Sequence, residues 1–344
     1  MKSVIFSETG DPSVLRLVDR EVAAPGPGEV RVRIVVSGVN PTDWKSRRGA
    51  KPGDALPYPE VVPNQDGAGV VDAVGSGVTG ISVGDRVWLT LAAYQRASGG
   101  TAQEYTVLPA KRVHPLPDSA SFDLGASLGV PAVTAHRALT VAEDGPSRLH
   151  PGALDGTIVL VAGGAGAVGH AAIQLAHWAG ATVITTVSSA EKAALATAAG
   201  ADHVVNYRKS DAAAEIRRIA PGGVNTIVEV SPAQNAELNL AIAANHATVS
   251  VYANNGGDTM SLDVRKHFSL NVRYQFLLLY TVGDEEIRAA VDDVTAAVRD
   301  CAMGVGEESG LPLHRFDLAH TAEAHAAVES GVTGKVLIDV AAVG

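Results

Sequence analysis

Hydrophobic and polar residues alternate with a period of two along the first third of the chain. In the segment 30–36, VRVRIVV, valine and isoleucine alternate with Arg31 and Arg33, as in a strand with one buried face. Clusters of proline and glycine separate this segment from similar runs at 4–8, 69–75 and 85–91. The pattern predicts a compact, mostly antiparallel β domain over the first 125 residues.

The pattern changes near residue 126, where apolar runs begin to alternate with alanine-rich stretches. The runs expected to form strands are 157–162, 182–187, 203–207, 226–230 and 247–253. The stretches expected to form helices are 167–179, 190–199, 211–220 and 234–244. This β-α-β-α order predicts an α/β fold, a doubly wound parallel sheet with helices on both faces.

The end of the chain mixes both patterns. A sixth strand is expected over 271–281, and apolar residues at helical spacing predict a helix over 284–301. Two further strands, at 312–316 and 335–340, are expected around a helix at 321–330. The run YQFLLLY at 274–280 would form an exposed apolar edge of the parallel sheet, which favours pairing with another strand.

Composition and charge exclude several classes of protein. A chain of 344 residues suggests two domains, and 27 basic against 37 acidic residues argue against a nucleic-acid partner. No apolar run approaches the roughly 18 residues of a membrane span, and the first residues lack the layout of a signal peptide. The single cysteine, Cys301, excludes an internal disulfide and favours a cytoplasmic location.

The most specific motif is GAGAVG, made up of Gly164, Ala165, Gly166, Ala167, Val168 and Gly169. It follows a predicted strand and opens a predicted helix, the context in which GxGxxG indicates a dinucleotide site. We expect Gly164 to permit a tight turn, Gly166 to let the backbone approach a pyrophosphate, and Gly169 to let the helix pack on the sheet. Free N–H groups at the helix start would face the phosphates.

The end of the second parallel strand indicates which dinucleotide binds. NAD sites usually place Asp or Glu there to hold the ribose 2′-hydroxyl, but residues 185–190 contain neither. Ser188 and Ser189 supply hydroxyl groups instead, and Lys192 adds a positive charge in the next helix. This set suits a 2′-phosphate and predicts NADPH as the cofactor. Ser189 is also placed to cap that helix.

With these motifs in place, the chain resembles the medium-chain dehydrogenase/reductase superfamily, in its zinc-free quinone oxidoreductase branch, the zeta-crystallin relatives. The stretches that carry the resemblance are SGVNPTDW (37–44), DGAGVVDAVGSGV (66–78) with VGDRV (83–87), VLVAGGAGAVG (159–169), and TTVSSAEK (185–192) with GADHVVNYR (200–208). The resemblance implies a GroES-like β domain built from 1–125 and 281–344, with a Rossmann NADPH-binding domain, 126–280, inserted between.

The resemblance also assigns cofactor residues. It places the 2′-phosphate contacts on Ser188, Lys192 and Tyr207. Further positions that face the cofactor in relatives, or that lie at strand ends, are Thr134, Ser231, Tyr252 and Lys335.

Three more residues are candidates for the substrate site. Asn40 is the best candidate for a catalytic hydrogen-bond donor to a substrate carbonyl, although Asn40-Pro41 can equally form a simple turn. Asp43 is expected to hold the loop or the nicotinamide ribose. Tyr94 lies in a loop where it either reaches the substrate or stays on the surface.

The residues at the zinc positions of related enzymes point to metal-free chemistry. Zinc relatives place Cys where this chain has Asn40, and His-Glu where it has Gln65 and Asp66. A catalytic zinc normally needs three protein ligands, and the eleven histidines are scattered, so no metal is expected. A quinone or α,β-unsaturated carbonyl delocalises the charge that hydride addition creates, so it needs no zinc. We therefore expect an NADPH-dependent reductase of such acceptors.

Alternatives stay open for the activity. Trp44 stands near where many relatives carry a tyrosine, and NPTDWK resembles the stand-alone enoyl reductases that act on thioester or polyketide intermediates. Crystallin relatives make a non-catalytic NADPH-binding protein a further alternative. Relatives pair the apolar sheet edge across a two-fold axis, so the resemblance implies a homodimer.

Overall fold

The structure is a computed structural model that describes residues 1–341, and the chain divides into two compact units. Unit 1 comprises Met1–Val130 together with the segment from Pro312 onward, and unit 2 comprises Pro131–Leu311. Both ends of the chain therefore belong to unit 1, and unit 2 is inserted between its parts. None of the helices within residues 1–341 combines the length and the apolar character that crossing a bilayer requires.

Unit 1 is built on a seven-stranded sheet in which β14 pairs in parallel with β15 and the other pairs are antiparallel. The order is β14-β15-β3-β4-β5-β7, and β6 pairs with β3. The strands are β3 (Glu29–Val39), β4 (Asp66–Val74), β5 (Arg86–Leu89), β6 (Tyr105–Pro109), β7 (Val113–Pro115), β14 (Leu313–Asp317) and β15 (Lys335–Asp339). A separate pair is formed by β1 (Lys2–Ile5) and β2 (Arg16–Asp19).

The alternating pattern of the first segment is confirmed in β3. Val30, Val32 and Ile34 are fully buried in the core, whereas Arg31 and Arg33 are half-buried on the opposite face. Because successive side chains of a strand point to opposite faces, this alternation fixes which face of β3 meets the core.

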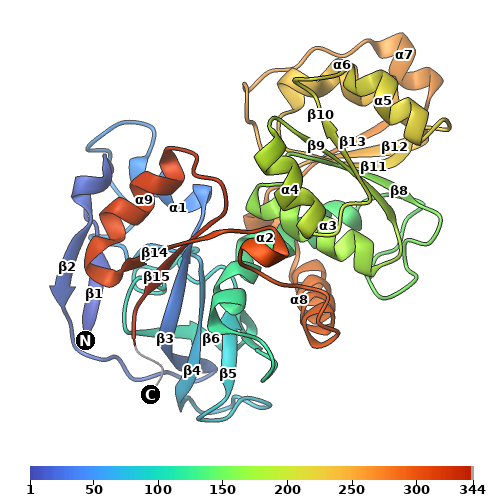
Figure 1. Cartoon of the computed structure of the whole chain (residues 1–344). Coiled ribbons are helices and arrows are strands. Elements are labelled where there is room, and N and C mark those ends of the chain that lie inside the picture. The colour runs from blue at the N-terminus through green and yellow to red at the C-terminus, as the bar shows by residue number, and fades with distance from the viewer. Residues whose placement is uncertain (342–344) are drawn as a thin grey trace. The chain divides into compact units, whose positions relative to one another are not determined.

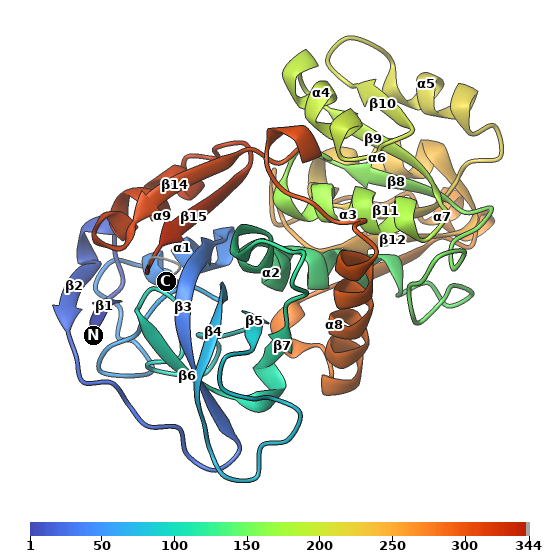
Figure 2. The ribbon, with the colours of Figure 1, turned by 60° about the horizontal axis from the view of Figure 1, so that its bottom comes forward.

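Among the described residues, two whole helices and three short 3₁₀ turns lie in unit 1. The helices are α1 (Pro41–Arg48) and α9 (Thr321–Glu329), and the turns are η1 (Pro12–Val14), η2 (Ala110–Arg112) and η5 (Leu318–His320). The two helices pack together, and Arg47, which is fully buried, donates from Nη2 to Glu329 Oε2 over 2.6 Å. Figure 2 shows α1, α9, β14 and β15 gathered in this part of unit 1.

The segment Asn40-Pro41 opens helix α1 and is not a simple turn. Asn40 is the residue before the first turn, and Pro41 occupies the first helical position, where its missing N–H costs no hydrogen bond. The Asp43 carboxylate accepts from the backbone N–H of Asn40 over 2.7 Å and fixes the helix start.

Unit 2 contains a six-stranded parallel sheet in the order β10-β9-β8-β11-β12-β13. Its strands are β8 (Ile158–Ala162), β9 (Thr182–Val187), β10 (His203–Asn206), β11 (Val224–Glu229), β12 (Ala243–Val251) and β13 (Arg273–Phe276). The chain starts in the middle at β8, runs outward to β10, and returns to β11 on the other side. The order therefore reverses between β8 and β11, where open α/β sheets bind their ligands.

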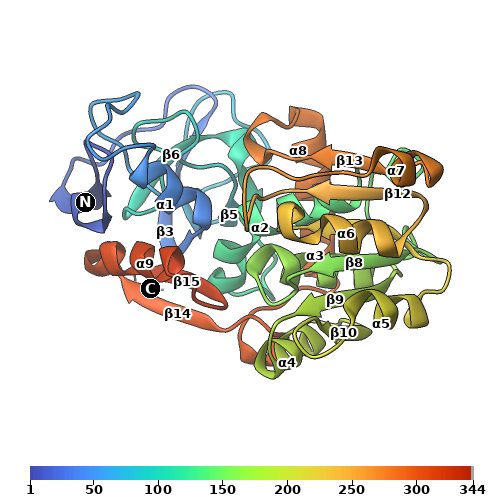
Figure 3. The ribbon, with the colours of Figure 1, turned by 90° about the horizontal axis from the view of Figure 1, so that it is seen from above.

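Helices cover both faces of this sheet, as the alternating pattern predicts. Those joining its first five strands are α3 (Ala167–Trp178), α4 (Ala190–Ala198), α5 (Ala212–Ile219) and α6 (Pro232–Ile242). In Figure 1, α3 and α4 lie on one side of the strands and α5 and α6 on the other. Figure 3 shows the strands from β10 to β13 side by side. The expected strands and helices from 157 to 253 are confirmed to within a few residues.

The expected sixth strand over 271–281 is shorter in the structure. Only β13 (Arg273–Phe276) pairs with β12, and the chain then turns through the 3₁₀ segment η3 (Leu279–Thr281). A short helix, α7 (Val264–Ser269), precedes it. β13 is the last strand in the order, and its final residue, Phe276, is 61% exposed.

Helix α2 (Phe122–Leu139) has no counterpart in the sequence expectations. It contains Pro131, which lacks an N–H and therefore leaves one helical hydrogen bond unmade. The boundary between the two units falls within α2, between Val130 and Pro131.

The second boundary falls later in the chain than the sequence suggested. It lies between Leu311 and Pro312 and not after residue 280, because α8 (Asp284–Arg299) belongs to unit 2. There Asp293 of α8 accepts hydrogen bonds from His136 of α2 and from Arg148. Gly304, beyond α8, is bonded in turn to Gln174 of α3.

Candidate functional site

The glycine motif forms a turn between β8 and α3 at the carboxyl end of the sheet. Gly166 is the residue before the first helical turn, and α3 begins at Ala167. The left-handed backbone of this turn belongs to Gly163, whose φ is +70°, and not to Gly164 as the motif suggested. The sequence reasoning missed Gly163, although GG directly after a strand is a signal for such a turn.

The three glycines of the motif are needed for different reasons. A Cβ on Gly164 would lie 2.2 Å from Thr185 Oγ1 of β9, so this glycine lets the turn pack against the neighbouring strand. A Cβ on Gly169 would lie 2.5 Å from the Gly163 carbonyl, so this one brings the helix close to the turn. A Cβ on Gly166 would meet nothing nearer than 3.5 Å, which leaves open space at the helix start. That space suits a phosphate group.

The residues expected at a 2′-phosphate lie together at the ends of β9 and β10. These strands are neighbours, and the backbone N–H of Tyr207 donates to the Val187 carbonyl over 3.2 Å. Ser189 Oγ accepts from the backbone N–H of Lys192 and caps α4, as expected. Tyr207 is half exposed and Lys192 is half-buried. Because β9 and β10 pair in register, their ends bring basic and hydroxyl-bearing side chains to the same edge of the sheet.

At the ends of β11 and β12, Ser231 and Tyr252 are joined through a residue that the sequence reasoning missed. Glu229, the last residue of β11, is fully buried and accepts from the backbone N–H of Ser231 over 2.6 Å. Its carbonyl accepts from the backbone N–H of Tyr252 over 3.1 Å. Burial and the charge of Glu229 both raise the pKa of the Tyr252 hydroxyl. Thr134 is buried in α2, within the same unit.

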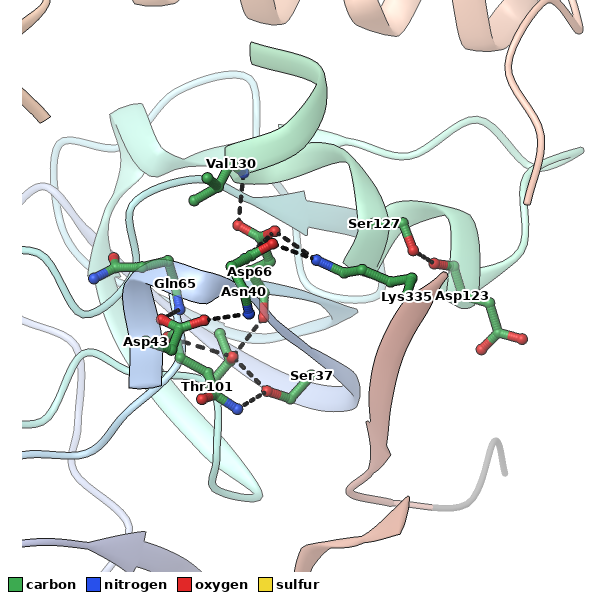
Figure 4. Close-up of polar contacts among 11 residues, drawn as sticks. Ser37, Asn40, Asp43, Gln65, Asp66, Thr101, Asp123, Ser127, Val130 and Lys335 are labelled. Atoms are coloured by element: carbon green, nitrogen blue, oxygen red, sulfur yellow. Dashed lines mark hydrogen bonds and ion pairs between the residues drawn. The ribbon is translucent and has the colours of Figure 1, made fainter. Parts of the chain in front are cut away.

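In unit 1, Asn40 and Lys335 meet at the carboxylate of Asp66 (Figure 4). Asn40 Nδ2 donates to Asp66 Oδ2 over 2.7 Å, and Lys335 Nζ donates to Asn40 Oδ1 over 2.7 Å. Lys335 Nζ also lies 3.2 Å from Asp66 Oδ2. Each of the three side chains is almost fully buried. Both ends of the Asn40 amide are therefore engaged, and its orientation is fixed.

Asp43 is buried beside this group. Besides the N–H of Asn40, its carboxylate accepts from the backbone N–H of Gln65 over 3.1 Å. Burial raises the pKa of Asp43 to about 8, and the nearby charge of Asp66 adds to the effect. Through these bonds, Asp43 holds the start of α1 at Asn40 close to the start of β4, which follows Gln65.

Asp66 also connects this group to helix α2. Its Oδ1 accepts from the backbone N–H of Val130 over 2.7 Å, immediately before Pro131 (Figure 4). A Cβ on Gly129 would lie 2.2 Å from the same oxygen, so only glycine leaves room for the carboxylate there. The sequence reasoning treated Asp66 only as an insufficient zinc ligand and did not predict this role.

Gln65 anchors the loop that contains Tyr94. Its carbonyl accepts from the N–H of Ala92, and its Oε1 accepts from the N–H of Ala93 over 3.1 Å. Arg112 Nη1 donates to the carbonyls of Leu91 and Tyr94 from the other side. Tyr94 is half-buried in a loop held at both ends.

The candidate residues thus form two groups, one in each unit. Asn40, Asp43 and Lys335 form one hydrogen-bonded cluster in unit 1, and Gln65 connects this cluster to the loop of Tyr94. The glycine turn, the β9 and β10 ends, and Ser231 with Tyr252 share the carboxyl edge of the unit 2 sheet. Within residues 1–341, no group of three or more His, Cys, Asp or Glu side chains is arranged to hold a metal ion.

Two family models match the chain, one in each unit. Residues 26–118 match the alcohol dehydrogenase GroES-like domain, and residues 167–296 match the family described as zinc-binding dehydrogenase. The first match lies in the antiparallel sheet of unit 1, and the second begins at the first residue of α3 and covers the strands β9 to β13 and most of α8. The fold is therefore a Rossmann sheet inserted in a GroES-like β domain.

Individual relatives match over nearly the whole chain. Human quinone oxidoreductase is 30% identical over 98% of this chain and 97% of its own length. A mycobacterial protein solved in complex with NADPH has a TM-score of 0.79 and 30% identity, covering 98% of this chain and 99% of that one. Escherichia coli quinone oxidoreductase in complex with NADPH has a TM-score of 0.79 and 25% identity over 98% and 100% of the two chains. The protein belongs to the medium-chain dehydrogenase/reductase superfamily, in its quinone oxidoreductase branch.

Proposed function

We propose that the protein is an NADPH-dependent reductase of quinones or α,β-unsaturated carbonyl compounds. The observation that carries the proposal is the carboxyl edge of the unit 2 sheet. There an open glycine turn at a helix start lies one strand from an edge with no carboxylate at 185–190 and with Lys192 nearby. Relatives solved with NADPH support the same assignment.

The residues of unit 2 would hold the two ends of NADPH. The N–H groups at the start of α3 and the space beside Gly166 suit the pyrophosphate, and Ser188, Lys192 and Tyr207 suit the 2′-phosphate. Ser231 and Tyr252 stand at the strand ends on the other side of the switch point. When bound, NADPH supplies a hydride from its nicotinamide ring; a quinone that takes up this hydride and one solvent proton becomes a hydroquinone.

The proposed reaction needs no zinc. The side chains at the positions where zinc relatives carry ligands already form hydrogen bonds within the protein. Asp66 accepts from Asn40, Lys335 and the N–H of Val130. The Lys335 ammonium, 3.2 Å from Asp66, supplies a positive charge that would repel a metal cation at the same place. We propose that the fixed amide of Asn40 serves as the hydrogen-bond donor on the substrate side, with Asp43 and Tyr94 supporting that side.

A panel assay of NADPH oxidation tests the proposal. We expect turnover with benzoquinone, phenanthrenequinone or a simple enone, at a rate unchanged when the enzyme is treated with a chelator. Activity confined to enoyl thioesters would instead establish an enoyl reductase. Tight NADPH binding with no turnover of any acceptor would establish a non-catalytic NADPH-binding protein. A rate that depends on added zinc would refute the metal-free reaction.

We also propose that the protein is a homodimer joined at the edge strand β13. Phe276 and Leu278 at this edge are 61% and 59% exposed. Helix α7, which contacts β13 through the rings of His267 and Tyr274, exposes Val264 and Phe268. An apolar strand edge of this kind invites pairing with another strand, and a second copy of the chain offers an identical edge.

A further inference from the structure

A buried carboxylate, that of Glu229, lies at the switch point of the unit 2 sheet. It is not part of the glycine motif. Glu229 is the last residue of β11 and has no exposed surface. β11 pairs with β8, the strand that leads into the glycine turn, and a Cβ on Gly163 would lie 3.4 Å from Val230 Cγ1. The segment that follows Glu229 is therefore in contact range of that turn.

Three donors converge on the Glu229 carboxylate. The backbone N–H of Ser231 donates to Oε1 over 2.6 Å, and Asn235 Nδ2 donates to the same oxygen over 3.0 Å. Asn239 Nδ2 donates to Oε2 over 2.6 Å. Burying a charged group is costly unless hydrogen bonds replace its water, and these three bonds do so. They also attach α6 to the end of β11.

The Glu229 carboxylate holds the loop after β11 through Ser231, and that loop is hydrogen-bonded to the loop after β12. The carboxylate therefore supports both loops. The backbone N–H of Asn255, after β12, donates to the Val230 carbonyl, and Ser231 Oγ donates to the Asn255 carbonyl over 2.7 Å. The backbone N–H of Tyr252 donates to the backbone carbonyl of Glu229, so the start of this second loop is also attached to the end of β11. Burial and the charge of Glu229 raise the pKa of Tyr274 to about 12, so the carboxylate influences this second tyrosine as well.

These loops lie on the β11 side of the switch point, whereas Lys192 and Tyr207 lie on the β9 and β10 side. A dinucleotide bound across a switch point places one half on each side. The adenosine 2′-phosphate belongs with Lys192, so the nicotinamide half belongs with Ser231 and Tyr252. Among the described residues, the hydrogen bonds of Glu229 lead to Ser231, Tyr252 and helix α6, which are all on the β11 side.

We propose that Glu229 is a positioning residue for the nicotinamide half of the cofactor, acting through Ser231 and the loop that follows Tyr252. The proposal rests on the NADPH-binding function inferred above. The proposed role of Glu229 is to hold the two loops at the nicotinamide half. Binding of the adenosine half does not depend on it.

The Glu229→Gln variant separates the shape of this support from its charge. The glutamine Oε1 still accepts from Ser231 and Asn235. Asn239 Oδ1 is buried without a hydrogen-bond partner among the residues described, so a flipped Asn239 amide can accept from the glutamine Nε2. Glu229→Ala removes the carboxylate with its three hydrogen bonds and keeps the backbone bond to Tyr252.

The experiment compares binding of NADPH with binding of 2′,5′-ADP, which carries only the adenosine half. For Glu229→Ala we expect NADPH affinity to fall by about tenfold and 2′,5′-ADP affinity to stay unchanged. Glu229→Gln should recover most of the NADPH affinity. An equal loss for both ligands, or no loss for either, would overturn the proposal.

Two controls keep the result interpretable. If Glu229→Ala does not fold, Asn235→Ala removes a single half-buried donor, and it should weaken NADPH binding alone, by a smaller factor; an unchanged NADPH affinity there overturns the proposal. Failure of the wild-type protein to bind NADPH would refute the proposed function and this inference together, whereas failure confined to the Glu229 and Asn235 variants refutes only the inference.

Discussion

At the scale of single residues, the glycines of the β8–α3 turn have separate physical roles. Gly164 fits against Thr185 of the neighbouring strand, where a methyl group would have no room. Gly166 faces open space at the helix start and has an extended backbone that any residue can adopt. One is therefore required by packing, and the other by the ligand that we propose.

We expect alanine to affect stability at Gly164 and cofactor binding at Gly166. Gly164→Ala should lower the free energy of unfolding by about 1–3 kcal/mol, because its methyl group collides with Thr185 Oγ1. Gly166→Ala should leave the melting temperature unchanged and weaken NADPH binding by about tenfold, since its methyl group fills the space for the pyrophosphate. Calorimetry and a binding titration measure the two effects. Equal melting temperatures for both variants would contradict this assignment.

Lys192 offers a second test at this scale. Lys192→Ala should raise the KM for NADPH by about tenfold and leave kcat nearly unchanged, because a charge-assisted bond to the 2′-phosphate is lost. NADH lacks that phosphate, so the KM of the same variant for NADH is the internal control and should not move. An unchanged KM for NADPH would show that the phosphate binds elsewhere.

At the scale of elements, Asp293 of α8 joins segments far apart in the sequence. It accepts from His136 Nε2 of α2 over 2.8 Å, from Arg148, and from the backbone N–H of Leu149 over 2.7 Å. The carboxylate is almost fully buried. These contacts explain why α8 belongs to unit 2, although it follows the last strand of the parallel sheet.

Removing the Asp293 carboxylate should loosen this connection. Asp293→Ala leaves the buried His136 and the Leu149 N–H without their partner, and we expect the free energy of unfolding to fall by roughly 3–5 kcal/mol. Asp292→Ala, the exposed neighbour on the same helix, should change it by less than about 0.5 kcal/mol. Chemical denaturation of both variants measures the difference, and equal values would contradict the role of Asp293.

The same residue predicts a pH dependence. Burial by itself would raise the pKa of Asp293, but the hydrogen bonds from His136 and Arg148 outweigh it and lower the pKa to about 2. A carboxyl whose folded pKa is lowered stabilises the fold above its ordinary pKa of 3.8. That contribution is lost as the pH falls from about 4 towards 2. Asp293→Asn should therefore show a flatter acid limb in melting temperature against pH, and an unchanged limb would contradict the assignment.

At the scale of the whole molecule, both boundaries between the units fall immediately before a proline, Pro131 and Pro312. Unit 1 is completed only when β15, near the end of the chain, pairs with β3. Lys335 then reaches Asn40, 295 residues earlier in the chain. The cluster on the proposed substrate side therefore exists only once both parts of unit 1 have joined.

The proposed dimer is the prediction that belongs to this scale. Wild-type protein should sediment as a dimer at micromolar concentration. Phe276→Lys combined with Leu278→Lys should give a folded monomer, because two charges at the exposed edge of β13 oppose strand pairing. Val83→Lys, at an equally exposed valine in unit 1, is the matched control and should remain dimeric. A wild-type monomer would refute the proposal.

The sequence by itself determined the features that depend on neighbours along the chain. The period-two alternation placed β3, and the glycine motif between strand and helix placed the turn at the start of α3. The sequence also has two serines after β9, where an NAD site has an acid, and a lysine in the helix that follows. These features are set by local backbone geometry and by side-chain spacing, which the sequence states directly.

Only the tertiary structure decided which distant residues meet. The Asp66 carboxylate joins Asn40, Lys335 and the backbone N–H of Val130 within α2, although each is separated from it by tens or hundreds of residues. In the sequence, nothing distinguishes Glu229 from the other acidic residues. In the structure it is buried and accepts hydrogen bonds from three donors. The reason is physical: a buried charge is stable only where the fold brings hydrogen-bond partners to it, and no local pattern records those partners.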